Sequence, residues 1–313
     1  MSVTVLITCC NEGPYLGQAV ESVLGQTADA EITEIHVLDD GSDEATRAVI
    51  RELAVTDTRI GVHLFDRSGV AGNRNRGLSM VTTEFVAFLD GDDIWERDKL
   101  ERQLCALRRH PSALLCYTGY RGFLDGDSSG RDVRVPDLSV VRDPPKRYFL
   151  DGPSVFPSTV LARTEAVARL DDGFIPDCTP FEDFELFFRL LVRGPFIGIP
   201  EPMVRKRYRK GSLSSRSPTL MARHAFASFR AAMACPRLLP LVPVRIAERA
   251  RRLALVHFYA SEFDQARALI TLALKTRPFS LKTWATAAIT GGGASSLTLL
   301  KHVAPERVRL HLY

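Results

Sequence analysis

Four apolar segments alternate with four segments of helical periodicity in the first third of the chain. The apolar segments are residues 3–8, 35–38, 61–66 and 85–89, and the units repeat at about 25 to 30 residues. Strands and helices that alternate in this way build a parallel sheet through βαβ crossovers. We therefore expect an α/β fold: a Rossmann-like, mostly parallel sheet flanked by helices.

Polar residues follow each of these four strands. The turns are residues 8–12, 39–40, 66–68 and 90–93. Right-handed crossovers place the carboxyl ends of parallel strands along one edge of the sheet, which is where ligands bind in open α/β sheets. The four turns are therefore expected to form one site.

The most acidic of these turns lies in VAFLDGDDIW, residues 86–95. Three carboxylates at the end of a buried strand are costly unless positive charge lies against them. Hard oxygen ligands suit Mg²⁺ or Mn²⁺, which would in turn hold a diphosphate. The alternative is an acidic turn that only caps the following helix, residues 96–109. The convergence of four polar turns favours the metal site.

Size and composition are those of an ordinary soluble protein. The chain has 313 residues, 45% hydrophobic and 25% charged, enough for one large α/β domain and a smaller part. We expect no signal peptide and no membrane span, because no stretch approaches the roughly 20 apolar residues that a span needs. The six cysteines show no CxxC pair or zinc-like spacing, so we expect reduced thiols in a cytoplasmic protein.

Charge divides the chain unevenly. Residues 1–200 hold 21 Lys+Arg and 32 Asp+Glu, a net charge of −11, whereas residues 201–313 hold 20 and 5, a net charge of +15. This asymmetry suggests that the C-terminal third faces something anionic: lipid head groups, a polyprenyl-diphosphate acceptor or an acidic protein. No nucleic-acid-binding module is recognisable. We expect peripheral association with the inner membrane face.

The rest of the chain gives weaker signals. Residues 121–150 are polar and rich in Gly and Pro, which predicts an irregular insertion. Residues 181–194 form a helix with apolar side chains on one face. Two short strands and a polar loop follow, and from about residue 218 the chain reads as helices. Residues 253–278 predict a helical hairpin that faintly resembles one tetratricopeptide unit.

Six segments, in order, resemble the family 2 glycosyltransferases of the GT-A fold. They are VTVLITCCNEGPYLGQAVESVLGQT, HVLDDGSDEAT, SGVAGNRNRGL, EFVAFLDGDDIW, FEDFELFFRL and RYRKGSLS, which together span residue 3 to about residue 214. The resemblance implies a GT-A domain over residues 1–215, with a nucleotide-binding half to about residue 118 and an acceptor half from about 119. A basic helical region, residues 216–313, would follow it.

The same resemblance implies an activity. The enzyme would transfer a sugar, with inversion, from a nucleoside diphosphate, most commonly that of uridine, to a hydroxyl of a polysaccharide, glycolipid or other glycoconjugate. Asp90 and Asp92 match the family's DXD motif, with Asp92 as ligand of Mg²⁺ or Mn²⁺. The residues that match nucleotide-contacting positions are Thr8, Cys10, Glu12, Asp39, Arg74 and Asp90. Thr8 replaces a frequent Pro, and Cys10 a frequent aromatic residue that stacks on the base.

Two further segments match the family's acceptor and diphosphate sites. Asp183 matches the catalytic base and Glu182 lies beside it on the acceptor side, although acids at a helix start also favour the helix dipole. The matches for a lid over the diphosphate are Arg207, Arg209, Lys210 and Ser212. Arg209 stands where many members carry a His that completes the metal shell. The alternative is a solvated basic loop.

Two other functions remain to be weighed. A nucleotidyltransferase also uses acids at strand ends with Mg²⁺, but it needs a Gly-rich triphosphate loop and a basic residue near the N-terminus, and ITCCNEGPYL has neither. A non-catalytic scaffold that binds sugar nucleotides would not need Asp92 and Asp183, so their presence argues against it.

Overall fold

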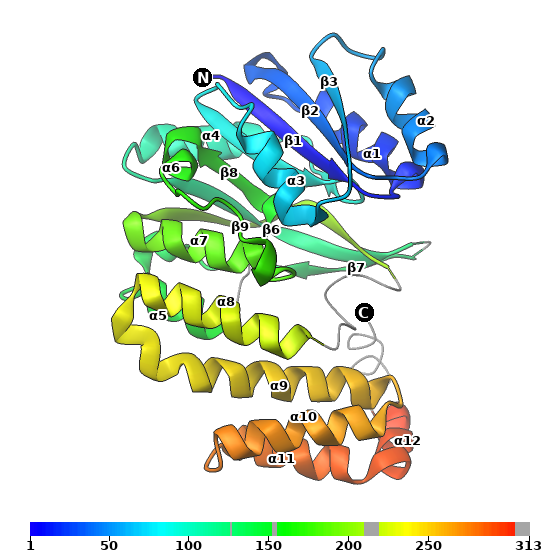
Figure 1. Cartoon of the computed structure of the whole chain (residues 1–313), viewed down its shortest axis with the longest axis vertical. Helices are drawn as coiled ribbons and strands as arrows, with labels where there is room; N and C mark the ends of the chain where they lie inside the picture. Colours follow the sequence, from blue (N-terminus) through cyan, green and yellow to red (C-terminus); the bar gives the residue numbers. More distant parts are fainter. Residues whose placement is uncertain (126, 152–154, 210–218, 304–313) are drawn as a thin grey trace. The chain divides into compact units, whose positions relative to one another are not determined.

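The computed structural model describes residues 1–125, 127–151, 155–209 and 219–303 (Figure 1). The chain divides into two compact units, Met1–Tyr208 and Arg209–Tyr313. The described residues of the first form a nine-stranded sheet, and the described part of the second is helical.

The first half of the sheet follows the predicted βαβ alternation. Its strands are β1 (Val3–Cys9), β2 (Ile32–Asp40), β3 (Ile60–Phe65) and β4 (Phe85–Asp90), connected by α1 (Gly13–Leu24), α2 (Glu44–Leu53) and α3 (Gly69–Leu78). These strands pair in parallel in the order β3-β2-β1-β4. Thr8 pairs with Asp90 and Cys9 with Asp39, so the strand ends meet at one edge as predicted.

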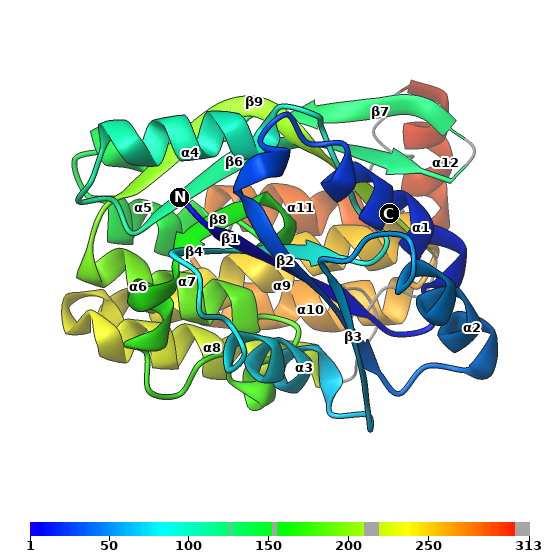
Figure 2. The same cartoon turned by 90° about the horizontal axis from the view of Figure 1, so that it is seen from above.

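Helices cover both faces of β1, which explains why all seven of its residues are buried. Val5 and Ile7 belong to the core cluster with Leu16 and Val20 of α1. On the opposite face α3 packs so closely on Leu6 that a Cβ at Gly77 would lie 3.1 Å from a methyl group of Leu6. Figure 2 shows α1 and α3 on opposite sides of β1.

The second half of the sheet mixes strand directions. The elements are β5 (Ile94–Trp95), α4 (Lys99–Arg109), β6 (Leu115–Leu124), β7 (Asp127–Val133), α5 (Pro144–Asp151), β8 (Val160–Arg163), α6 (Thr164–Ala168), α7 (Glu182–Arg193) and β9 (Phe196–Tyr208). The order continues β4-β8-β6-β9-β5, with β8 antiparallel to both β4 and β6. Two sequence predictions were wrong here. Residues 121–150 contain β7 and α5 rather than an irregular insertion, and residues 196–208 form one strand rather than two.

Aromatic packing fixes α7. Phe184, Phe187 and Phe188 are fully buried, and Phe184 stacks on Tyr148 of α5 with ring centroids 5.6 Å apart. Buried aromatic side chains contribute the largest packing areas in a core. The helix start, with Glu182 and Asp183, is therefore held in a rigid position.

The second unit contains α8 (Leu220–Ala234), α9 (Val242–Tyr259), α10 (Phe263–Thr276), α11 (Leu281–Gly291) and α12 (Gly293–Val303). Helices α9 and α10 form the predicted hairpin, with Ala250, Ala254 and Ala273 buried together where they pack. None of the described helices combines the length and the hydropathy needed to cross a bilayer.

Candidate active site

Arg74 of α3 connects two acidic segments that lie far apart in sequence. Its Nη2 donates to Asp90 Oδ1 at 2.7 Å, and its Nη1 donates to Glu182 Oε1 at 2.8 Å. The arginine is 4% exposed, so both pairs are shielded from water and stronger than surface pairs. Thr8 Oγ1 also donates to Asp90, at 3.3 Å. Four of the predicted site residues, Thr8, Arg74, Asp90 and Glu182, are thereby brought together.

Asp183 lies beside this pair at the start of α7. It is half-buried, and its Oδ1 accepts a hydrogen bond of 2.6 Å from the backbone N–H of Phe184. Burial, reinforced by the negative charge of Glu182, raises the pKa of Asp183 to about 7, although Arg74 acts in the opposite direction. A carboxylate with a pKa near neutrality is well matched to general-base catalysis.

Glu182 contributes an unusual buried atom. Its Oε2 is buried and has no hydrogen-bond partner among the described residues, while its Oε1 is held by Arg74. A buried oxygen without a donor costs about 1–3 kcal/mol, and a ligand hydroxyl would remove that cost.

Lys206 of β9 is a site residue that the sequence reasoning missed. Burial acts to lower the pKa of its ammonium, but the charges of Asp93, Asp90 and Asp92 outweigh burial and raise it. The ammonium also lies 4.0 Å from the ring centroid of Phe156. The only sequence signal was a lysine on a strand ahead of the basic loop, and nothing in that pattern indicates the pairing of β9 beside the acidic turn.

The turn after β4 is fixed by Asp93, which faces inward. Asp93 Oδ2 accepts from Ser158 Oγ at 2.7 Å, and Oδ1 accepts from the backbone N–H of Arg207 at 3.0 Å. Burial, together with the charges of Asp92 and Asp90, raises the pKa of Asp93 to about 7. Asp93 therefore shapes the turn, while Asp92 stays half-buried.

Arg207 holds the same turn from its other side. Its Nε donates to Asp92 O at 3.0 Å and its Nη2 to Gln18 Oε1 at 2.8 Å, and Nη1 pairs with Asp125. The guanidinium is thus engaged within the protein rather than offered to a ligand. Of the other predicted lid residues, Arg209 is half-buried, and Lys210 and Ser212 lie outside the described residues.

A divalent cation fits the acidic turn only together with its substrate. Within the described ranges no group of three or more His, Cys, Asp or Glu could hold a metal ion. The Asp90 side chain is nonetheless 26% exposed, its Oδ1 alone is bonded to Arg74 and Thr8, and Asp92 is half-buried. Mg²⁺ is commonly held by one or two carboxylates plus substrate phosphates, and the two aspartates meet that requirement.

The other predicted nucleotide-contacting residues line the edge formed by β1 and β2. Asp39 is buried and accepts from Ser42 N at 3.1 Å and from Arg47 Nε at 3.1 Å, so it closes a turn. Cys10 is half-buried, and its sulfur accepts from Arg67 Nη2 at 2.8 Å.

Glu12 lies next to the acidic turn. A Cβ at Gly91 would come within 2.8 Å of Glu12 Oε2 and within 2.9 Å of Thr8 O. The second position of the DGD turn therefore accepts only glycine without a shift of its neighbours.

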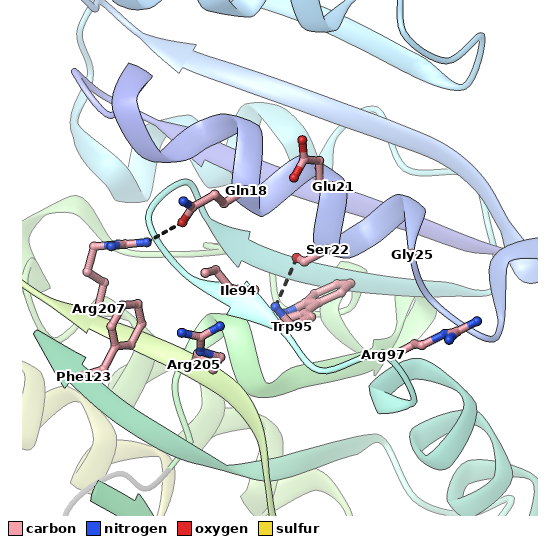
Figure 3. A pocket seen from close by; sticks show the side chains of 10 residues that line it. All are labelled: Gln18, Glu21, Ser22, Gly25, Ile94, Trp95, Arg97, Phe123, Arg205 and Arg207. Atoms are coloured by element: carbon pink, nitrogen blue, oxygen red, sulfur yellow. Dashed lines mark hydrogen bonds between the residues drawn. The ribbon is translucent and has the colours of Figure 1, made fainter. Parts of the chain in front are cut away.

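A hollow of about 560 Å³ lies between α1, β5 and β9, away from these acids (Figure 3). Gln18, Trp95, Arg205 and Arg207 are among its lining residues, and Asp90, Asp92 and Asp183 are not. The hollow adjoins the acidic turn through Ile94 and Trp95, which follow Asp93 in the chain, and through Arg207, whose backbone N–H donates to Asp93.

Comparison with protein families decides the class of the molecule. The model of glycosyl transferase family 2 matches residues 4–166. The chain belongs to this family. The resemblance seen in the sequence motifs is thereby confirmed, and the chain is a glycosyltransferase.

Two relatives from Bacillus subtilis strain 168 support the assignment to family 2. One is TuaG, named as a glycosyltransferase of teichuronic acid biosynthesis, which is 29% identical over 216 residues, 68% of this chain and 81% of TuaG. The other is EpsH, named as a glycosyltransferase, which is 28% identical over 149 residues, 48% of this chain and 42% of EpsH.

Solved structures show the same fold. S. aureus TarS 1-349 in complex with UDP-GlcNAc has a TM-score of 0.62 at 16% identity, and the match covers 93% of this chain and 90% of TarS 1-349. The complex with UDP has a TM-score of 0.60 at 17% identity, over 82% and 72% of the two chains. The predicted GT-A fold with a helical C-terminal region is confirmed.

Proposed function

We propose that this family 2 enzyme transfers a sugar, with inversion, from a uridine diphosphate sugar to an alcohol, assisted by Mg²⁺ or Mn²⁺. The observation that carries the proposal is Arg74, whose guanidinium binds Asp90 and Glu182 at once. Arg74 thereby holds the turn that carries Asp92 close to the helix start that carries Asp183. Opposed acidic groups are what displacement at an anomeric carbon requires, one near the leaving diphosphate and one near the attacking oxygen.

In this proposal Asp183 is the general base. Its pKa of about 7 leaves a large fraction ionised near neutral pH, and a carboxylate so poised accepts a proton more readily than one at the ordinary value. The unpartnered Oε2 of Glu182 accepts a hydrogen bond from a sugar hydroxyl and so orients it. Arg74 holds Glu182 and stays in place during the reaction.

The leaving-group side of the site is formed by Asp92, Asp90 and Lys206. A divalent cation bound by Asp92 and Asp90 together with the diphosphate would supply Lewis-acid neutralisation of the departing charge. Lys206, whose pKa is raised by the charges of these aspartates, adds positive charge on the same side. Arg207 keeps the turn in position through its bond to Asp92 O.

The choice of donor and acceptor rests on the relatives. TarS was crystallised with UDP and with UDP-GlcNAc, and its fold is that of this chain, which supports uridine diphosphate as the nucleotide. The name of TuaG refers to teichuronic acid biosynthesis, which supports a glycan or lipid-linked acceptor. We further propose that the enzyme works in the cytoplasm, peripherally on the inner membrane face, because residues 201–313 carry a net charge of +15.

A thermal-shift panel tests the donor side. The full chain is heated with uridine, guanosine or thymidine diphosphate, each with Mn²⁺ and with a chelator. We expect uridine diphosphate with Mn²⁺ to raise the midpoint temperature of unfolding most, because a ligand that binds only the folded state stabilises that state. Hydrolysis of uridine diphosphate sugars is then measured in the same buffers. A midpoint that rises equally with chelator present would contradict metal assistance, and a preference for another nucleotide would replace the donor assignment.

A further inference from the structure

Helix α11 has its polarity reversed relative to an ordinary surface helix. Thr283, Thr286 and Thr290 are buried, and the hydroxyls of Thr286 and Thr290 donate to backbone carbonyls of their own helix, at 2.9 and 3.0 Å. The exposed side carries Leu281, Trp284, Ala285, Ala288 and Ile289, which we call the α11 apolar face. Residues spaced by three and four lie on one side of a helix, so the face is continuous.

The turn before α11 extends this apolar surface. Phe279 is 96% exposed, Leu281 86% and Trp284 56%. The turn is nevertheless ordered: Trp284 Nε1 donates to Pro278 O at 2.7 Å, and Ser280 caps α11 by accepting from Thr283 N. Large apolar side chains held outward by a built turn mark an interaction surface rather than a chance exposure.

The charged side chains in the segment that carries the apolar face are all of one sign. Residues 265–303 contain five Lys and Arg and no Asp or Glu. Lys275, Arg277 and Lys282 flank the turn on the two helices, are exposed, and form no ion pair within the described part of the chain. Exposed Trp, Phe and Leu beside Lys and Arg are the composition of helices that lie in the interface of an anionic bilayer.

We propose that the α10–α11 turn and the α11 apolar face dock on an anionic lipid membrane. The apolar side chains enter the boundary between head groups and acyl chains, the indole of Trp284 lies at the level of the head groups, and the flanking cations face lipid phosphates. Charge favours an anionic membrane over a second copy of this chain, because a second copy would place like cations against each other. The inference rests on the peripheral location proposed above and names the surface responsible for it.

Vesicle sedimentation with the full chain tests this surface. Vesicles of phosphatidylcholine alone are compared with vesicles that also contain phosphatidylglycerol, at low salt and in the absence of donor and metal. We expect binding to the anionic vesicles only. The double change Phe279→Ser with Trp284→Ser should weaken binding at least about thirtyfold, from the apolar area lost. The change Arg277→Gln with Lys282→Gln should weaken it about twentyfold.

Matched controls separate the surface from general effects. Val55 of the first unit is 86% exposed, and Val55→Ser should leave vesicle binding unchanged. The emission of Trp284 should shift to the blue on binding, whereas Trp95, 3% exposed, already has a buried indole; Trp284→Phe should keep the binding and lose the shift. Equal binding by the Phe279→Ser, Trp284→Ser variant, or none by the wild type, would overturn the inference.

Two further measurements keep this outcome distinct from the proposed activity. The donor-dependent thermal shift and donor hydrolysis in vesicle-free buffer should be the same in wild type and in both double variants, because none of these residues belongs to the active site. A double variant that loses vesicle binding and keeps hydrolysis has lost the membrane surface alone, with its active site intact. Light scattering tests whether a second copy of the chain occupies the face instead. If the wild type is a dimer and the double change Phe279→Ser with Trp284→Ser makes it a monomer, the face serves self-association and the proposal is overturned.

Discussion

The turn that follows β4 and the start of α7 both carry partly buried carboxylates, but their neighbours shift the carboxylate pKa in opposite directions. In each, the first acid, Asp90 or Glu182, is bound by Arg74, while the next acid along the chain stays half-buried. At the turn, Arg74 and Lys206 overcome the effect of burial and hold the pKa of Asp90 below its ordinary value. At α7, burial and Glu182 raise the pKa of Asp183 to about 7.

This difference separates two kinds of carboxylate. Asp90 at the strand end is paired with Arg74, its pKa is held low by Arg74 and Lys206, and it stays ionised, which suits a ligand of a metal. Asp183 stands beside another acid in a partly desolvated place, which suits a group that must pick up a proton. The same residue type thus acquires two chemistries from its neighbours.

The largest expected effect comes from removing the base. Asp183→Asn should lower kcat by about 10² to 10⁴, the usual contribution of a positioned base, with the uridine diphosphate thermal shift unchanged. Asp177→Asn, an exposed carboxylate on the segment just before α7, serves as the matched control and should keep full activity. Undiminished transfer by Asp183→Asn would favour a different base or a role as a binding scaffold.

Removing the metal ligand should affect the other side of the comparison. Asp92→Asn should lower kcat by about 10² or more, because several kcal/mol of charge stabilisation are lost, and it should abolish the Mn²⁺-dependent part of the nucleotide thermal shift. Asp171→Asn, an exposed acid in the turn after α6, is the control. A metal-dependent shift that survives in Asp92→Asn would move the ligand role to another residue.

The pH dependence sharpens the contrast. A base is active when ionised, so kcat should rise with pH through about 7 and fall about tenfold per unit below it. Glu182→Gln removes the neighbouring charge that raises the pKa of Asp183 and should move the inflection to lower pH. Values of kcat measured across pH with saturating donor give the inflection of the wild type and that of Glu182→Gln. If Glu182→Gln leaves the inflection unchanged, the inflection belongs to a group other than Asp183.

The smallest expected change comes from Lys206. Lys206→Met removes positive charge beside the leaving group and should lower kcat about tenfold. It should also move the inflection upward, because the ammonium lowers the pKa of Asp183. The opposite shifts in Lys206→Met and Glu182→Gln, measured in one series, test whether both residues act on the same carboxyl group.

The sequence predicted the fold well because its signals were local. Apolar runs that end in acids, and helices between them, determine a parallel sheet and its binding edge. Residues 121–150 were mispredicted because their strand, β7, is stabilised by pairing with β6 rather than by an apolar pattern of its own. A ladder formed with a distant partner leaves little trace in composition.

The site was predictable only where motifs mark it. Asp90, Asp92, Glu182 and Asp183 follow from their place at element ends, but their shared guanidinium does not. The motif match of Arg74 predicted a nucleotide contact, but not its pairing with Asp90 and Glu182. Arg74 lies in the middle of α3, and only the packing of α3 against β1 buries it. Lys206 was missed for the same reason, since the pairing of β9 with β5 is a long-range event.

The single guanidinium of Arg74 makes the donor and acceptor sides of this enzyme mutually dependent. In the proposed mechanism, a change of metal or a substitution beside Asp90 is expected to alter the pairing of Arg74 with Glu182 and, through Glu182, the pKa of Asp183. An engineer who retunes metal preference in this chain should therefore expect the optimum pH to move with it, and would have to adjust both ends of the guanidinium together.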